Sequence, residues 1–309
     1  MRSSGTVMCL ASGAAFGAMA VFGKLAYGEG VTVGTLLAAR FAIAAGLFWL
    51  LLLAGGGARE VRALGRRDRR TGLALGACGY AVQAGCFFAA LERIDASLLS
   101  LLLYTYPALV AVAAVALGRE RLDGRRVTAL ALALGGLVLV LAGAGTGALD
   151  AVGAALGVTA ALVYTTYILV SEGVVGRVRA PVLSALVCTG AAVSLTAGSA
   201  LLGELRPGDV TLAGWGWLVC LSAVSTVGAI SLFFAGLRRV GPTTASILST
   251  VEPIVTVLAA FAVFGEKLDA VQLAGGALVI AAVLVLNVRV RTRAGTAAIA
   301  DAGVERAAA

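Results

Sequence analysis

A single acidic residue, Glu252, lies inside the apolar segment 243–264, and Pro253 follows it directly. A carboxyl group removed from water favours its neutral form, so such a residue can carry a proton or bind a cationic group. The proline cannot donate a hydrogen bond to the carbonyl of Ser249, which leaves an acceptor free near the carboxyl group. We therefore predict that Glu252 carries a proton or faces a substrate, and that Pro253 bends the helix. The alternative is a packing role, in which Glu252 locks this helix to a neighbour.

Two cations also lie within apolar segments. Lys24 is close to the end of segment 5–27, from where its long side chain can reach the polar interface of a membrane. Arg40 lies deeper in segment 32–54 and needs a partner or a water-filled cavity. Either side chain could bind a carboxylate or phosphate group of a substrate. Otherwise the two cations anchor their helices or form ion pairs, for which Glu252 is one candidate partner.

Neutral polar side chains also lie within several of the apolar segments. Tyrosines of an interfacial belt lie near helix ends, whereas every tyrosine here except Tyr27 lies at or near mid-segment. We expect several of these side chains to line an interior cavity, with helix packing as the alternative. The predicted binding residues of this polar set are Tyr80, Gln83, Tyr104, Tyr106, Tyr164 and Ser249. Pro107 is expected to bend segment 96–117 in the way that Pro253 bends its own segment.

Several kinds of chemistry are excluded by what the sequence lacks. It has no histidine, the commonest metal ligand, and its five cysteines are scattered through apolar segments. We therefore predict no catalytic residue, no metal and no cofactor. The chain also has no Walker-type phosphate-binding loop, which excludes ATP-driven work within it. The net charge of +8 does not indicate nucleic acid as a partner, because most of the basic residues lie in the loops between apolar segments.

The elements that must position these residues are membrane helices. Of the 309 residues, 60% are hydrophobic and 13% are charged, and the mean hydropathy is +1.00. A helix that crosses a bilayer needs about 20 apolar residues. Ten segments meet this need: 5–27, 32–54, 71–91, 96–117, 126–144, 150–170, 181–202, 213–237, 243–264 and 270–288. The predicted fold class is thus an all-α integral membrane protein with ten transmembrane helices.

The chain repeats itself at a constant offset of 146 residues. Residues 87–123 and 233–269 align without a gap, and 14 of the 37 pairs are identical, including Pro107 with Pro253 and Glu120 with Glu266. Each half then holds five helices, so the second half starts from the opposite face of the membrane. We predict two inverted five-helix repeats around a central cavity, in residues 1–146 and 147–290, followed by a short cytoplasmic tail in 291–309. Inverted repeats are typical of secondary transporters.

The basic residues support this topology. If the amino terminus is cytoplasmic, 19 of the 24 Lys and Arg residues fall in cytoplasmic loops or tails, and only Arg93, Arg206 and Lys267 fall outside. Short loops rich in Lys and Arg stay cytoplasmic. We predict that both termini are cytoplasmic. Only two of the basic residues are lysine and alanine is abundant, which suggests a GC-rich bacterial genome and hence a plasma membrane protein.

The order of these motifs resembles the EamA branch of the drug/metabolite transporter superfamily. The resemblance rests on the FFAAL and FFAGL endings, on Glu252-Pro253, and on GRERLD and GEKLD after the fourth and ninth segments. It covers nearly the whole chain and implies a carrier, in a family with many exporters of amino acids or other small metabolites. The first half departs from the family pattern, with Tyr106-Pro107 in place of Glu-Pro, and the first segment has Phe16 where the family often has Trp.

We therefore expect a secondary transporter that exports a small organic metabolite, such as an amino acid, across the plasma membrane by alternating access. Proton coupling and exchange are both open as the driving mechanism. The expected partners are a small-molecule substrate and the lipid bilayer, with a homodimer left open. The alternatives are an integral membrane enzyme and a membrane sensor or assembly protein that transports nothing.

Overall fold

The computed structural model describes residues 2–118, 123–143, 150–175, 177–240, 245 and 248–287. Every regular element within these residues is helical. The first half contains α1 (Arg2–Gly17), α2 (Met19–Gly28), α3 (Val33–Ala54), α4 (Ala58–Ala63), α5 (Arg66–Ala74), the π-helical segment η1 (Leu75–Tyr80), α6 (Ala81–Leu91), α7 (Ala96–Leu103), α8 (Tyr106–Ala116) and α9 (Gly124–Gly143). The second half contains α10 (Ala151–Val175), α11 (Ala180–Leu201), the 3-10 turn η2 (Pro207–Asp209), α12 (Leu212–Ser222), the π-helical segment η3 (Ala223–Gly228), α13 (Ala229–Val240), α15 (Val251–Phe264) and α16 (Ala270–Asn287).

Within the described ranges, seven helical segments are long and apolar enough to cross a membrane: Ser3–Gly28, Val33–Ala54, Arg66–Leu91, Ala96–Ala116, Ala151–Ser171, Ala180–Leu201 and Leu212–Val240. Three further apolar helices, Val127–Gly143, Val251–Phe264 and Ala270–Val285, are shorter. Helices satisfy their backbone hydrogen bonds internally, which is why apolar runs of this length adopt them in lipid. The described part of the chain is thus all-helical, and the protein is a multi-pass membrane protein. Where the structure describes them, the ten predicted segments fall on helices, but the number of ten crossings stays a prediction.

Matching irregularities occur in the two halves. The helical segment from α7 to α8 is interrupted at Tyr104 and Thr105, and Pro107 lies in the first turn of α8. In the other half a turn at Thr250 precedes α15, and Pro253 lies in its first turn. A proline is tolerated there because its missing N–H would have no partner within the helix. The sequence predicted a bend at each proline, and an interruption precedes both. The π-helical segments η1 and η3 form a second matched pair.

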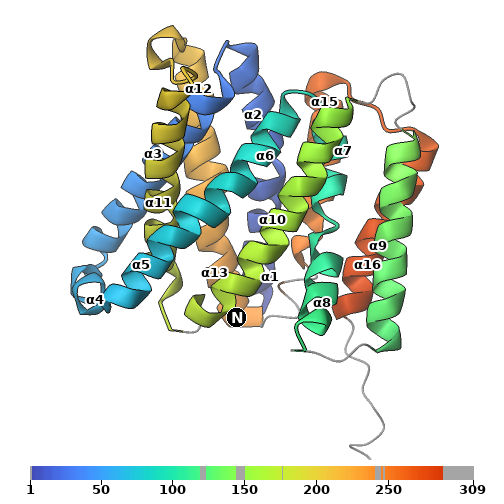
Figure 1. The fold of residues 1–309 in the computed structure, drawn as a ribbon, viewed down its shortest axis with the longest axis horizontal. Coiled ribbons are helices and arrows are strands. Elements are labelled where there is room, and N and C mark those ends of the chain that lie inside the picture. The colour runs from blue at the N-terminus through green and yellow to red at the C-terminus, as the bar shows by residue number, and fades with distance from the viewer. Residues whose placement is uncertain are drawn as a thin grey trace, which may run out of the picture.

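The packing of the helices also has two-fold character (Figure 1). Helix α1 of the first half packs against α13 and α15 of the second half. Its counterpart α10 in the second half packs against α6, α7 and α8 of the first half. The two most extensive contacts join equivalent helices, α9 with α16 and α3 with α11, and α9 and α16 lie side by side at one edge of the bundle. Exchanging the two halves therefore reproduces these four groups of contacts. This layout fits two repeats of five predicted helices.

Glycines allow the closest of these contacts. A β-carbon on Gly17 of α1 would lie 2.7 Å from the carbonyl oxygen of Glu252, and one on Gly13 would lie 2.5 Å from Val251. The two glycines are four residues apart, so they share one helix face. The absence of side chains at both positions lets α1 pack directly on the first turn of α15. This packing sets the position of Glu252 in the bundle.

Candidate functional site

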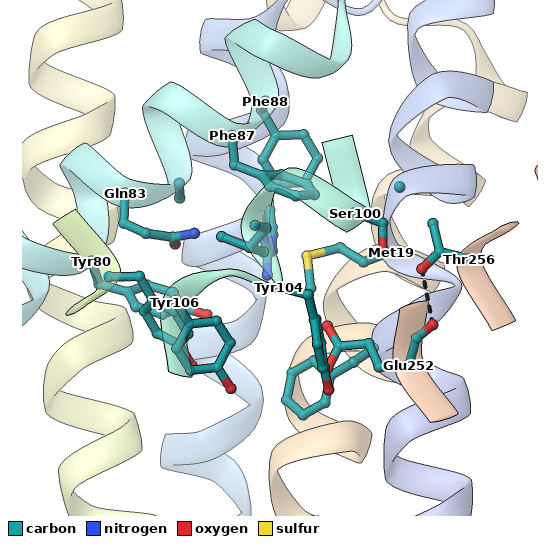
Figure 2. Close-up of a pocket in the computed structure, with 16 residues that line it drawn as sticks. Met19, Tyr80, Gln83, Phe87, Phe88, Ser100, Tyr104, Tyr106, Glu252 and Thr256 are labelled. Atoms are coloured by element: carbon teal, nitrogen blue, oxygen red, sulfur yellow. Dashed lines mark hydrogen bonds between the residues drawn. The ribbon is translucent and has the colours of Figure 1, made fainter. Parts of the chain in front are cut away.

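A cavity of about 100 Å³ lies between helices of both halves (Figure 2). Its lining residues are Phe16, Met19, Ala20, Arg40, Tyr80, Gln83, Ala84, Phe87, Phe88, Ser100, Leu103, Tyr104, Tyr106, Tyr164, Glu252 and Thr256. Seven of the nine polar residues predicted from the sequence are among them. The other two, Lys24 and Ser249, are not part of the lining.

Glu252 reaches the cavity from the first turn of α15, where the hydroxyl of Thr256 links this turn to α1. The hydroxyl of Thr256 donates to the carbonyl of Glu252 at 3.1 Å and to that of Gly17 on α1 at 3.0 Å. Among the residues that the structure describes, no ion pair forms between Glu252 and either Arg40 or Lys24. Tyr106, the repeat counterpart of Glu252, lines the same cavity. The two residues that precede the prolines thus meet at one site.

The carbonyl acceptor that Pro253 leaves free has a partner from the other half. The hydroxyl of Tyr104 donates to the carbonyl oxygen of Ser249 at 2.5 Å. The side chain of Ser249 donates to the carbonyl of Ala245 within its own segment. Ser249 therefore supports the site through its main chain, by joining the end of α7 to the segment that precedes α15. This bond crosses between the two interrupted helices.

Arg40 is buried, with only 2% of its surface exposed. Its Nε donates to the hydroxyl of Thr226 in η3 at 3.1 Å. The guanidinium lies over the rings of Phe41 and Phe88, at 5.0 and 5.1 Å from the ring centres. Aromatic faces attract a cation that has lost its water. Within the described part of the chain, no carboxylate forms an ion pair with Arg40.

Tyrosine rings form one wall of the cavity. Tyr104, Tyr106 and Tyr164 are in successive contact, with ring centres 5.9 and 4.6 Å apart. The series continues through Tyr167, which is not itself a lining residue, to Tyr80, with ring centres 6.1 and 5.6 Å apart. These rings come from α8, α10 and η1 and from the turn at Tyr104, so they connect the two halves. The wall offers apolar ring surface together with phenolic hydroxyls, which suits a small organic molecule with polar groups.

Lys24 lies beyond the cavity and forms ion pairs there. Its Nζ is 2.6 Å from Glu266 Oε1 and 3.6 Å from Asp95 Oδ1. Of the alternatives open for Lys24, the structure thus shows an ion pair, with partners other than Glu252. Glu266 was noted in the sequence only as part of the repeat, although its two oxygens turn out to be the centre of a polar cluster.

Sequence reasoning missed two kinds of lining residue. Thr256 is one helical turn from Glu252, and Ser100 is one turn from Tyr104, so their spacing could have shown that they share a face with known candidates. The aromatic and apolar residues gave no such signal, because in an apolar helix they resemble residues that pack against lipid or neighbours. As for cofactors, no group of three or more His, Cys, Asp or Glu that could hold a metal occurs in the part of the chain described.

Comparison with known proteins agrees with this architecture. The EamA-like transporter family matches residues 3–142 and again residues 151–288, one match in each half. An uncharacterized transporter of Archaeoglobus fulgidus is 30% identical over 225 residues, which cover 73% of this chain and 78% of that protein. The uncharacterized transporter YcbK of Bacillus subtilis is 26% identical over 286 residues, covering 88% and 89%. One solved crystal structure shares the fold with a TM-score of 0.66 and 19% identity, over 94% of this chain and all of that one. The chain belongs to the EamA-like transporter family.

Proposed function

We propose that this protein is a secondary carrier that exports a small organic metabolite, such as an amino acid, and that Glu252 is its proton-linked or substrate-facing acid. The observation that carries the proposal is the cavity itself, because Glu252, Arg40 and the tyrosine wall meet in it from both halves. An acid inside a membrane protein is costly unless it faces a cavity or a partner. Here it faces a cavity and has no ion pair within the described residues.

The lining suggests how a substrate would be held. Arg40 supplies a buried cation for an anionic group, and Gln83 and the tyrosine hydroxyls supply neutral hydrogen-bonding groups. Glu252 supplies an acid that binds either a proton or a cationic group of the substrate, but not both at once. Competition of this kind couples the movement of one to that of the other. Alternating access then follows from exposing the cavity to each side of the membrane in turn.

The direct test is transport by purified protein in proteoliposomes with an imposed pH gradient. A panel of amino acids, sugars, nucleosides and cationic drugs should contain at least one substrate with saturable flux. We expect that substrate to be recovered chemically unchanged, whereas a membrane enzyme would convert it. The absence of saturable flux across the panel, with protein shown to be folded, would argue for the sensor or assembly alternative.

For topology, we propose that both termini are cytoplasmic in a bacterial plasma membrane, with residues 1–146 and 147–290 as the inverted repeats. Single cysteines at Arg67 and Asp209, in a background without native cysteines, should then react with a membrane-impermeant thiol reagent from opposite faces. Arg67 is expected to react from the cytoplasm and Asp209 from outside, because the loops around them differ in basic residues. Reaction of both positions from one face would contradict the inverted arrangement.

A further inference from the structure

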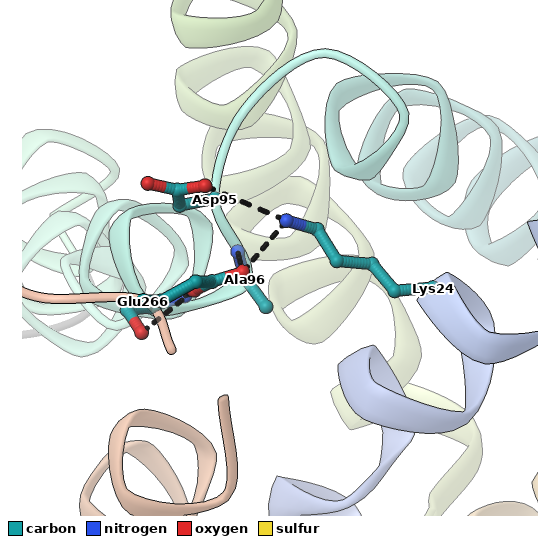
Figure 3. A network of polar contacts seen from close by, with 5 residues as sticks. Lys24, Asp95, Ala96 and Glu266 are labelled. Carbon is teal, nitrogen blue, oxygen red and sulfur yellow. Dashed lines mark hydrogen bonds and ion pairs between the residues drawn. The ribbon is translucent and has the colours of Figure 1, made fainter. Parts of the chain in front are cut away.

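Beyond the cavity, the carboxylate of Glu266 gathers four hydrogen-bond donors from two other helices (Figure 3). Oε1 accepts from Lys24 Nζ at 2.6 Å and from the backbone N–H of Ala96 at 3.2 Å. Oε2 accepts from the N–H and the hydroxyl of Ser97 at 3.0 and 2.9 Å. The two N–H groups belong to the first turn of α7, where a helix has no internal partners for them. Glu266 thus caps α7 from the far end of the sequence.

The charge on Glu266 is maintained although its side chain is only 6% exposed. Burial acts to raise the pKa of Glu266, but the hydrogen bonds from Lys24 and Ser97 outweigh it, so this pKa lies below its ordinary value. The carboxylate is therefore ionised at neutral pH. Asp95, which is 62% exposed, adds a second negative charge 3.6 Å from Lys24. We call Lys24, Asp95, Ala96, Ser97 and Glu266 the end cluster.

The end cluster lies about one helical turn beyond the cavity. Lys24 is four residues after Ala20, which lines the cavity, so both side chains project from the same face. Ser97 is three residues before Ser100, another lining residue. Glu266 follows α15 directly, after a left-handed glycine at 265, and Lys24 also lies over the ring of Phe264 at 5.7 Å. The cluster therefore joins α2, α7 and α15 over one end of the cavity.

We propose that the end cluster is a gate, which holds this end of the cavity closed and must separate for substrate to pass. An ion pair that is mostly withdrawn from water is costly to break by removing one partner, so it can hold helices together until substrate or a proton shifts them. That the end cluster opens during transport rests on the proposed function. That the end cluster closes the cavity can be tested without measuring transport.

The other half does not offer the same gate. The residue equivalent to Glu266 is Glu120, which lies outside the described residues, but the element equivalent to α1 and α2 is α10, and residues 151–175 contain no lysine or arginine. An ion pair like that of Lys24 therefore cannot form from α10. The ion pair between Lys24 and Glu266 therefore has no counterpart formed by α10.

Access to the cavity can be measured with a cysteine at Ser100 in a background without native cysteines. A membrane-impermeant maleimide is applied to vesicles of both orientations. In a separate protein, a single cysteine at Asp209 shows by its reaction which orientation exposes the face that carries the end cluster. From that face, the Ser100→Cys protein should react slowly. We expect Lys24→Met and Glu266→Gln each to raise the rate about tenfold or more, and Lys24→Arg, which keeps the cation, to stay within about twofold.

The matched control is the ion pair between Arg93 and Asp150, 3.4 Å apart and much more exposed. It joins two loops and includes no residue that lines the cavity. Arg93→Gln and Asp150→Asn should leave the reaction rate within about twofold, because exposed pairs contribute little. If Glu266→Gln is poorly folded by gel filtration, Lys24→Met decides the result, since it leaves the amide and hydroxyl donors of Ser97 in place. An unchanged rate in a folded Lys24→Met protein overturns the gate.

A second measurement asks whether the gate must open during transport. Cysteines at Lys24 and Asp95, joined by a cleavable bifunctional thiol reagent, should stop flux of the identified substrate, and cleavage should restore it. Normal flux with the bridge in place overturns the gating role. Failure of the unmodified protein to transport anything would instead refute the proposed function, and the labelling result would still decide whether the end cluster closes the cavity.

Discussion

Replacing Glu252 with glutamine is expected to abolish pH-driven accumulation of substrate while exchange of substrate across the membrane continues. Glutamine keeps nearly the same shape and can still form hydrogen bonds, but it cannot titrate. The sequence has no histidine to take over proton transfer, and among the residues that the structure describes Glu252 is the only acid that lines the cavity. Accumulation in proteoliposomes with an imposed pH gradient should therefore fall to the level of liposomes without protein. Counterflow of labelled substrate, measured without a gradient, should stay close to that of the parent.

The control for this result is Glu92→Gln, which removes an exposed carboxylate just after α6. It should leave both assays unchanged. If Glu252 instead only locks α15 to its neighbours, Glu252→Gln should be nearly silent in both assays. In that case Glu252→Ala should lower thermal stability, because it leaves space where the side chain lay. Normal proton-driven accumulation by the Gln variant would make Glu252 a structural residue and would require another source of energy.

The polar part of the cavity could be predicted from the sequence because polar side chains are conspicuous in apolar segments. Burying a charge or a hydroxyl in a membrane is costly, so Glu252, Arg40 and Tyr106 had to face a partner or a cavity. The repeat added a second argument, since Tyr106 and Glu252 occupy equivalent positions before equivalent prolines. The structure places both residues at the same cavity. Their roles in binding remain part of our proposal.

Other features of the site depend on contacts that no local pattern encodes. Lys24 and Glu266 are separated by 242 residues, and only the packing of α2, α7 and α15 brings them together. The sequence left open whether Lys24 reaches the interface, binds substrate or forms an ion pair, because all three need the same residue type at the same depth. The same holds for Phe87 and Phe88, whose rings could equally have faced lipid. The π-helical segments η1 and η3 also had no recognisable sequence signal.

Alanine at Gly76 or Gly190 is expected to destabilise the protein, although alanine normally favours a helix. Gly76 belongs to η1 and packs against α11. Gly190 belongs to α11 and packs against α5. A β-carbon on Gly76 would lie 2.0 Å from the carbonyl oxygen of Val187, and one on Gly190 would lie 2.1 Å from that of Leu73. Both obstacles are backbone atoms, which cannot rotate away as a side chain can. Overpacking of this kind costs about 1–3 kcal/mol or more.

Gly46→Ala is the matched control, because Gly46 lies within α3 and a β-carbon there would meet nothing within 4 Å. Alanine at that position should be neutral or stabilising by up to about 1 kcal/mol, through its higher helix propensity. Thermal unfolding of the purified protein, followed by gel filtration after heating, should thus show opposite signs for Gly46→Ala and for the two contact variants. A contact variant as stable as Gly46→Ala would contradict the close approach of these helices.

Because Tyr80 is one turn after Gly76 on the same element, forcing η1 away from α11 would also displace Tyr80 from the cavity wall. We therefore expect Gly76→Ala to lose transport at temperatures where it is still folded.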